Sequence, residues 1–319
     1  MTKQQIDQIK GVFFGQAIGD ALGLGTEFLD KQQIAKYYPN GLFEYAQIVQ
    51  DNHRKNYPIG DWTDDTDHFL CICDSILAAN NIDEKAFAVE LHKWHKETSR
   101  GAGATISQVV SMPQFTEFPH KAAELVWKLS DMQNAANGAI MRTSIIGTYE
   151  FWDQQKVMEN TEKISKVTHW DPRCVGSCVI VTHIISSILA QNIFPTIEQI
   201  IKIAEKYDER IRPFVEKAKN YDISSLYLDE DNSIGYTLKA LSAGLWVYFN
   251  ASDFETGILK VVHEGGDADS NACIAGSLLG AKYGFNSIPE KYIDGLINKT
   301  ILENKFNAYI DNLKNVNRQ

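Results

Sequence analysis

The sequence predicts an all-α fold, and three observations support this prediction. Apolar residues recur at helical spacing nearly everywhere along the 319 residues. No run alternates convincingly between apolar and polar residues, and there is no short internal repeat. No linker rich in proline, glycine and serine divides the chain, and its 44% hydrophobic content suffices for a large core. We therefore expect a compact, single-domain, multi-helix bundle over residues 1–319.

The expected first helix carries two stripes of residues. Ile6, Ile9, Phe13, Ala17 and Ala21 lie on one apolar face. Gly11, Gly15, Gly19 and Gly23 recur every four residues on another face. Because each glycine costs a helix about 1 kcal/mol, four of them on one stripe predict that a neighbouring backbone packs very close. This helix is expected to be central.

The remaining expected helices follow in chain order. After Thr63, apolar residues fall at positions 69, 70, 73, 76 and 77, which is the spacing of a core-facing helix. Similar patterns occur at 85–96, 122–129, 174–190, 235–249 and 272–283. Functional residues are expected at helix starts and in the loops between helices.

Two acidic clusters about two hundred residues apart each open directly into an expected helix. They occupy residues 63–67 and 265–270. Asp, Ser and Thr are ordinary helix N-caps, so each cluster alone is compatible with capping. A cap uses a single side-chain oxygen, however, whereas the clusters together supply more short oxygen donors than caps need: Thr63, Asp64, Asp65, Asp267, Asp269 and Ser270. If folding brings them together, a cation would remove their mutual repulsion.

The donor types predict which metal would bind. The set contains no His or Cys, so it favours Mg²⁺ or Mn²⁺ over zinc or copper. A calcium-binding EF-hand loop starting at Asp267 would need Gly and Glu where Ala272 and Leu278 stand. An Asp-Asp-x-x-Asp run of the prenyl-diphosphate type would need Asp in place of His68. The spacing therefore argues against both of these alternative interpretations.

Bulk properties limit the partners and the compartment. The net charge of −10 and the pI near 5.3 disfavour stable nucleic-acid binding, but permit a small phosphorylated ligand. The five cysteines lack paired Cys-x-x-Cys spacing, so we expect reduced core residues. The N-terminus is too polar for a signal peptide, and no apolar stretch is expected to reach the length of a membrane span. A cytoplasmic protein without membrane association is the expectation.

At this point the sequence resembles the ADP-ribosylglycohydrolase family, the magnesium-dependent hydrolases that include dinitrogenase reductase-activating glycohydrolases and ADP-ribosylarginine and ADP-ribosylserine hydrolases. The resemblance covers residues 11–284. It rests on five motifs in the family's order: 15–23 with Glu27, 62–66, 137–142, 168–169 and 265–270. It implies a compact all-α domain with two Mg²⁺ ions, or Mn²⁺, at the bottom of a cleft.

The resemblance assigns roles to the acidic residues. Thr63, Asp64 and Asp65 match the metal ligands of the first acidic motif, and Asp267, Asp269 and Ser270 match those of the last. Ser270 stands where the family commonly has threonine, and it keeps a hydroxyl. Glu27 matches a glutamate implicated in gating and acid/base chemistry. The resemblance therefore implies that Glu27, Asp64 and Asp65 are catalytic.

The resemblance also implies a substrate-binding set. Asn137, Gly138, Met141 and Arg142 belong to the expected diphosphate loop, and His169 is expected beside the ADP-ribose. Gly101 and Gly103 are similar to a glycine-rich loop near the cleft, although an ordinary turn explains them equally well. Some relatives place an aromatic residue before the diphosphate loop to stack on adenine. This chain has Ala135 and Ala136 there, which leaves the adenine platform open.

The expected activity is metal-assisted cleavage of the glycosidic bond between ADP-ribose and a protein side chain, through an oxocarbenium-like transition state. The expected partners are an ADP-ribosylated protein as substrate and ADP-ribose as product. Arginine linkage is marginally preferred by analogy of fold. A hydrolase of serine-linked, nucleic-acid-linked or O-acyl ADP-ribose stays open as an alternative. So does a catalytically inactive ADP-ribose-binding or structural relative.

Overall fold

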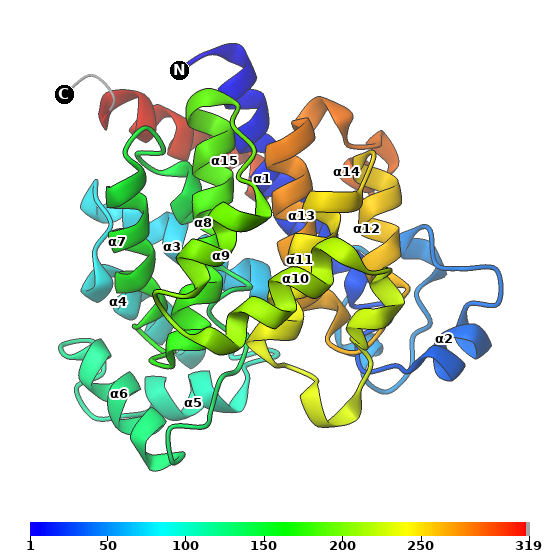
Figure 1. Ribbon diagram of the computed structural model, residues 1–319, viewed down its shortest axis with the longest axis horizontal. Helices are drawn as coiled ribbons and strands as arrows, with labels where there is room; N and C mark the ends of the chain where they lie inside the picture. The colour runs from blue at the N-terminus through cyan, green and yellow to red at the C-terminus, as the bar shows by residue number, and fades with distance from the viewer. Residues whose placement is uncertain (317–319) are drawn as a thin grey trace.

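The computed structural model describes residues 1–316, and within them the regular structure is helical (Figure 1). The only extended pairing in this range is an isolated antiparallel bridge between Ala136 and Tyr236. The α-helices are α1 (Lys3–Gly23), α2 (Lys31–Tyr37), α3 (Asp64–Ala79), α4 (Glu84–Glu97), α5 (Ala104–Val110), α6 (Pro119–Leu129), α7 (Gln154–Ser165), α8 (Pro172–Gln191), α9 (Ile197–Ala204), α10 (Arg212–Asn220), α11 (Thr237–Asn250), α12 (Phe254–Val262), α13 (Ala268–Tyr283), α14 (Glu290–Gly295) and α15 (Lys299–Val316). The all-α prediction is confirmed.

The glycine stripe of α1 lies directly against α13. A Cβ added at Gly15 would collide with the carbonyl oxygen of Gly276, and one added at Gly19 would collide with that of Ala272. The reverse also holds, because a Cβ at Gly276 would meet the backbone of Gly15. The two backbones therefore touch without side chains between them, which confirms the close approach that the stripe predicts.

The direction of this contact decides where the functional segments meet. Gly11 faces Gly280 near the end of α13, whereas Gly23 faces Ala268 at its beginning. The two helices are therefore antiparallel, and they run side by side through the centre of the molecule (Figure 1). The segment that follows α1, which contains Glu27, consequently lies beside the start of α13, where the second acidic cluster stands.

Aromatic packing joins α3 and the C-terminal helix to the same central helix. The ring of Phe13 lies edge-on to that of Phe69 in α3, with 4.9 Å between centroids. Its centroid is 5.6 Å from that of Phe306 in α15. All three rings are buried. Helices α1, α3, α13 and α15 thus share one core, and the predicted apolar face of α3 points into it.

Helix α8 corrects one expectation from the sequence. It is 20 residues long, and its most apolar window has a mean hydropathy of 1.7, so it is long and apolar enough to cross a membrane. The prediction that no apolar stretch reaches this length is therefore wrong. In the structure 78% of that window is buried inside the protein, where α8 packs against α7, α11 and α13. Its apolar character is accounted for by a place in the core.

Two smaller outcomes concern local structure. All five cysteines are free and buried, as expected for core residues. The helix expected from position 235 begins instead at Thr237. Gly235 has a φ of +77°, which a right-handed helix does not allow. Its carbonyl oxygen accepts the N–H of Asn137 at 2.9 Å, and this bond ties the start of α11 to the predicted diphosphate loop.

Candidate active site

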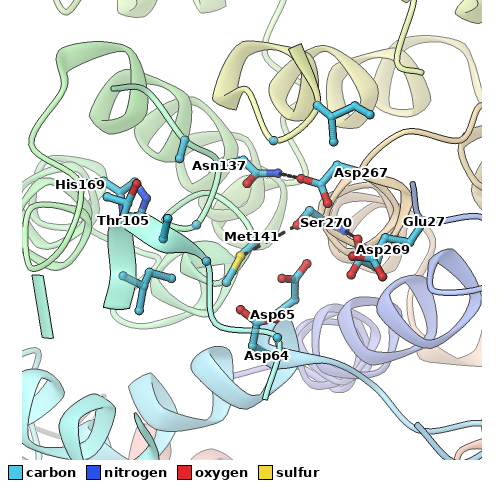
Figure 2. Close-up of a pocket in the computed structure, with 18 of the residues that line it drawn as sticks. Glu27, Asp64, Asp65, Thr105, Asn137, Met141, His169, Asp267, Asp269 and Ser270 are labelled. Carbon is cyan, nitrogen blue, oxygen red and sulfur yellow. Dashed lines mark hydrogen bonds between the residues drawn. The ribbon is translucent and has the colours of Figure 1, made fainter. Parts of the chain in front are cut away.

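A cavity of about 440 Å³ opens where the starts of α3 and α13 meet the segment after α1. Its volume lies in the range of about 300–1,000 Å³ that is usual for small-molecule sites. The sequence-predicted residues that line it are Glu27, Asp64, Asp65, Gly101, Gly103, Asn137, Gly138, Met141, His169, Asp267, Asp269 and Ser270. The two acidic clusters, remote in sequence, therefore face one cavity (Figure 2).

Thr63 connects the two clusters without lining the cavity. It is the N-cap of α3, and its Oγ1 accepts the N–H of Asp65 at 3.4 Å. The same hydroxyl lies 3.5 Å from Oδ2 of Asp269 and can donate to it. Thr63 is buried and is absent from the cavity lining. In this structure its hydroxyl performs the capping role that the sequence left open, and it also contacts the second cluster.

Asp20, in the middle of the first glycine-rich motif, holds the start of α3 in place. Its Oδ1 accepts the N–H of Thr63 at 2.9 Å, and its Oδ2 accepts the N–H and the Oγ1–H of Thr66 at 2.9 and 2.7 Å. Burial raises the pKa of Asp20 to about 6, and these hydrogen bonds lower it in part. Sequence reasoning gave Asp20 no role. A carboxylate within an apolar, glycine-rich helix was the available signal.

A second polar clamp fixes the loop before α5. Both oxygens of Asp67 accept hydrogen bonds from Arg100, at 2.8 and 3.0 Å. Arg100 also donates to Asp61 at 2.7 Å. The next residue, Gly101, has a φ of +75°, and an added Cβ would strike Oδ1 of Asp64. The clamp therefore holds the Gly101 backbone so close to the Asp64 carboxylate that a side chain at this position would collide with it. An ordinary turn would not impose this constraint.

The second acidic cluster is positioned by its own loop and by the opposite wall. Gly265 and Gly266 have φ values of +75° and +67°, a conformation that favours glycine. The N–H of Gly266 donates to the oxygen of Leu29 at 3.0 Å. Across the cavity, Nδ2 of Asn137 donates to Oδ2 of Asp267 at 2.8 Å (Figure 2). This hydrogen bond links the predicted diphosphate loop to the predicted metal ligands.

Glu27 faces the second acidic cluster and pairs with a histidine. Its Oε2 lies 2.6 Å from Nε2 of His53. Burial raises the pKa of Glu27, although the His53 hydrogen bond opposes this rise. The hydrogen bond from Glu27 raises the pKa of His53. His53 was not anticipated from the sequence, because no motif surrounds it.

The carboxylates of the cavity form a concentrated, buried acid set. Burial, together with repulsion from neighbouring carboxylates, raises the pKa of Asp64, Asp65 and Asp269. Oδ2 of Asp65 is buried and has no hydrogen-bond partner within residues 1–316. Carboxylate oxygens of Glu27, Asp267 and Asp269 lie within 4.8 Å of one another. Closely spaced, oxygen-only donors with an unpartnered buried oxygen fit a hard divalent cation.

The other end of the cavity is lined by residues without a carboxylate. His169 lies there, opposite Glu27 (Figure 2). Its Nδ1 pairs with Oγ1 of Thr168 at 2.8 Å, while its Nε2 is buried without a partner in the described part of the chain. Burial lowers the pKa of His169 to about 3, so the ring is neutral at pH 7. A Cβ on Gly138 would approach this ring to 2.9 Å, which explains the glycine at that position.

Arg142 lies apart from the other residues of the predicted substrate-binding set. Its side chain is fully buried and does not line the cavity. The guanidinium donates to Oγ1 of Thr168 and lies 4.9 Å from the centroid of the Phe87 ring. The chain turns after Met141 into a 3₁₀-helix (Thr143–Thr148), and the Arg142 side chain enters the core beneath the loop. Its contacts support the loop and do not reach the cavity.

Comparisons with known proteins concern the sequence and the fold. The sequence pattern of the ADP-ribosylglycohydrolase family matches residues 1–318. An uncharacterized protein of Archaeoglobus fulgidus is 30% identical over 303 residues, covering 93% of this chain and 94% of that protein. A solved structure described as an ADP-ribosylglycohydrolase-related protein complex superposes with a TM-score of 0.76 at 24% identity, covering 97% of this chain and 98% of that one. The structural match concerns the fold.

Several relatives carry functional names. The ADP-ribosylarginine hydrolase Tri1 of Serratia proteamaculans is 26% identical, covering 94% of this chain and 78% of its own length. The ADP-ribosyl-[dinitrogen reductase] glycohydrolase of Rhodospirillum rubrum is 23% identical, covering 91% of this chain and 90% of its own. With the family match over nearly the whole chain, these relatives complete the assignment. The chain belongs to the ADP-ribosylglycohydrolase family and is a glycosidic-bond hydrolase.

Proposed function

We propose that this protein removes ADP-ribose from arginine side chains of modified proteins, with Mg²⁺ as the metal and Mn²⁺ as a possible substitute. The observation that carries the proposal is the meeting of both acidic clusters in one cavity. Arginine linkage is supported by relatives from Serratia proteamaculans and Pseudomonas putida, both named ADP-ribosylarginine hydrolases. The cavity retains an oxygen donor at every predicted ligand position that lines it, which argues against an inactive relative.

The metal-holding residues set the direction in which the substrate binds. Cations held by the carboxylates around Asp64 and Asp269 would orient the distal ribose through its hydroxyls, and the diphosphate therefore belongs at the other end of the cavity. The backbone around Gly138 permits close approach there, and the neutral His169 offers Nε2 as a hydrogen-bonding atom. The distal ribose and its glycosidic bond then lie among the carboxylates, and the leaving side chain lies beside Glu27.

The acidic residues of the cavity would bind the metal ions. Asp64 and Asp65 on one side, and Asp267, Asp269 and Ser270 on the other, would hold two ions, with the Thr63 hydroxyl beside Asp269. When bound, the cations would polarise hydroxyl or water oxygens and neutralise the buried carboxylates. Asn137 would keep Asp267 in orientation through the hydrogen bond at 2.8 Å.

Glu27 and His53 would donate and transfer the proton that the reaction requires. Leaving-group departure in glycoside cleavage needs a proton donor, and a buried carboxyl with a raised pKa is suited to that role. Glu27 Oε2 shares a hydrogen bond with Nε2 of His53. The His53 side chain is 37% exposed, so it connects the buried carboxyl to solvent. This pair can therefore pass a proton between the leaving group and water.

The test is to incubate the purified protein with arginine-, serine- and nucleic-acid-linked ADP-ribose side by side. We expect ADP-ribose release from the arginine conjugate in Mg²⁺ and loss of release in EDTA, with recovery when Mg²⁺ or Mn²⁺ is restored. Preference for another conjugate would overturn the linkage. Full activity in EDTA would overturn the metal. Binding of ADP-ribose without release from any conjugate would instead favour the inactive relative.

A further inference from the structure

We propose that Phe28 recognises the guanidinium of the leaving arginine, by presenting its aromatic ring at the acidic end of the cavity. This inference deepens the proposed function and rests on it. Phe28 lines the cavity and follows Glu27 directly in the chain. Its side chain is 54% exposed, so it is not a core residue.

The backbone conformation of Phe28 is fixed by hydrogen bonds between this segment and Gly266. Its φ is +57°, a region that glycine or asparagine enters easily and a bulky aromatic rarely does. The Phe28 N–H donates to the oxygen of Gly266 at 2.6 Å, and the Gly266 N–H returns a bond to Leu29 at 3.0 Å. An aromatic residue in this conformation, without burial in the core, is typical of strain kept at a functional site.

The groups around the Phe28 ring favour the binding of a planar cation. One side of the Phe28 ring is approached by His53, with 5.3 Å between ring centroids and an interplanar angle of 52°. A carboxylate oxygen of Glu27, the residue before Phe28, lies within 4.8 Å of carboxylate oxygens of Asp267 and Asp269. An aromatic face beside carboxylates attracts a guanidinium through cation–π and stacking contacts, whereas it offers no such contact to a neutral serine hydroxyl.

The position of Phe28 also agrees with the direction of substrate binding. The diphosphate is directed towards Gly138 and His169, so the modified side chain must leave at the Glu27 end. Glu27 and His169 lie at opposite ends of the cavity (Figure 2). Phe28 is therefore beside the leaving group, and it is remote from the end where the adenosine would extend.

The test compares Phe28→Leu with Phe28→Tyr. Both substitutions keep a bulky side chain at the positive φ, so they differ mainly in the aromatic face. We expect Phe28→Leu to lower kcat/KM for the arginine conjugate about tenfold and to weaken inhibition by free agmatine to a similar extent. Phe28→Tyr should keep both within about twofold of the original protein. The control Phe118→Leu changes an aromatic that is 44% exposed and absent from the cavity lining, and should have no effect.

The affinity for free ADP-ribose, measured by calorimetry, separates the outcomes. It should be unchanged in Phe28→Leu, because ADP-ribose lacks the guanidinium. An equal loss of ADP-ribose affinity would show that the ring stacks on the nucleotide, and would overturn the inference. Unchanged agmatine inhibition in Phe28→Leu would overturn it as well. If the original protein does not cleave the arginine conjugate, the proposed function itself fails, which is a distinguishable result.

Discussion

The two acidic clusters that share the cavity are held in place by different physical means. The cluster on α13 is carried by a helix whose backbone touches that of α1 at Gly15, Gly19 and Gly276. The cluster on α3 is held by charged hydrogen bonds, from Asp20 within the core and from the Asp67–Arg100 pair near the surface. One half of the site therefore depends on steric contact, and the other half depends on electrostatics.

This difference determines how each half responds to change. Backbone contacts do not weaken with pH or salt, but they tolerate no added atom. Hydrogen-bonded carboxylates tolerate small displacements, yet they depend on protonation and on their partners. Mutations of the backbone contacts that hold the α13 cluster should act mainly through stability, whereas mutations of the hydrogen bonds that hold the α3 cluster should act mainly through activity.

The largest effect is expected from Gly19→Ala. Its new Cβ would meet the carbonyl oxygen of Ala272, so the two helices must separate along their contact. We expect a loss of about 3 kcal/mol or more in the free energy of unfolding, measured in urea, with activity falling in parallel. The control is Gly103→Ala, where an added Cβ has no atom within 4 Å. A change above about 1 kcal/mol there, or no change at Gly19, would contradict the steric account.

The next effect concerns the carboxylates themselves. Asp64→Asn and Asp269→Asn should each lower kcat about a thousandfold, because each removes a charge that the reaction centre uses. In the metal-free protein neither should lower Tm, since each removes a buried charge that its neighbours repel. Asp74→Asn is the matched control, because it lies on the same helix but pairs with Lys305. Retained activity in either site variant would separate that residue from catalysis.

The third prediction concerns pH and metal. Burial raises the pKa of Asp20 to about 6 and also raises that of Asp65, so the folded state binds more protons than the unfolded chain. The stability that this protonation provides is present below about pH 4 and is lost as pH rises through 6. The Tm of metal-free protein should therefore fall, by about 5 °C between pH 5 and 8, as measured by calorimetry.

Magnesium provides the control for this pH dependence. Because Mg²⁺ would bind only the folded state, it should raise Tm most at pH 8, where the carboxylates are charged. The pH dependence should consequently flatten in excess Mg²⁺. A Tm that rises with pH in EDTA, or that does not respond to Mg²⁺ or Mn²⁺ at pH 8, would be inconsistent with an acid set built for a cation.

The smallest effect is expected at the surface clamp. Arg100→Gln removes the bonds to Asp61 and Asp67, and so releases the Gly101 backbone that lies against Asp64. Because the Arg100 side chain is 30% exposed, the loss of stability should be only about 1 kcal/mol. Activity should fall about tenfold through the displaced loop. Arg212→Gln, which breaks exposed pairs on α10, should leave activity unchanged, and an equal loss there would contradict the clamp.

Most of the central architecture could be predicted from the sequence. The glycine stripe predicted a close helix contact, and the apolar spacing after Thr63 predicted α3. Helices such as α9 and α10 were not anticipated individually. They span only Ile197–Ala204 and Arg212–Asn220, and periodicity over such short segments is weak.

The candidate site was predicted less completely. The acidic residues were found because oxygen donors in excess of capping needs are visible in a single segment. Arg142 was assigned to the substrate because the resemblance places residues 137–142 in the diphosphate loop, whereas here the chain turns its side chain into the core. The roles of His53 and Arg100 were not predicted, because they come from partners distant in sequence.

The sequence by itself determined the helical class, the stripe that allows two backbones to touch, and the chemistry of the oxygen donors. These are local properties, set by side-chain size, spacing and atom type. Only the tertiary structure decided that α1 and α13 run antiparallel, which brings Glu27 to Asp267 and Asp269. The physical reason is that the helical pattern specifies which face is buried, while the partner and its direction depend on how all the helices fill the core together.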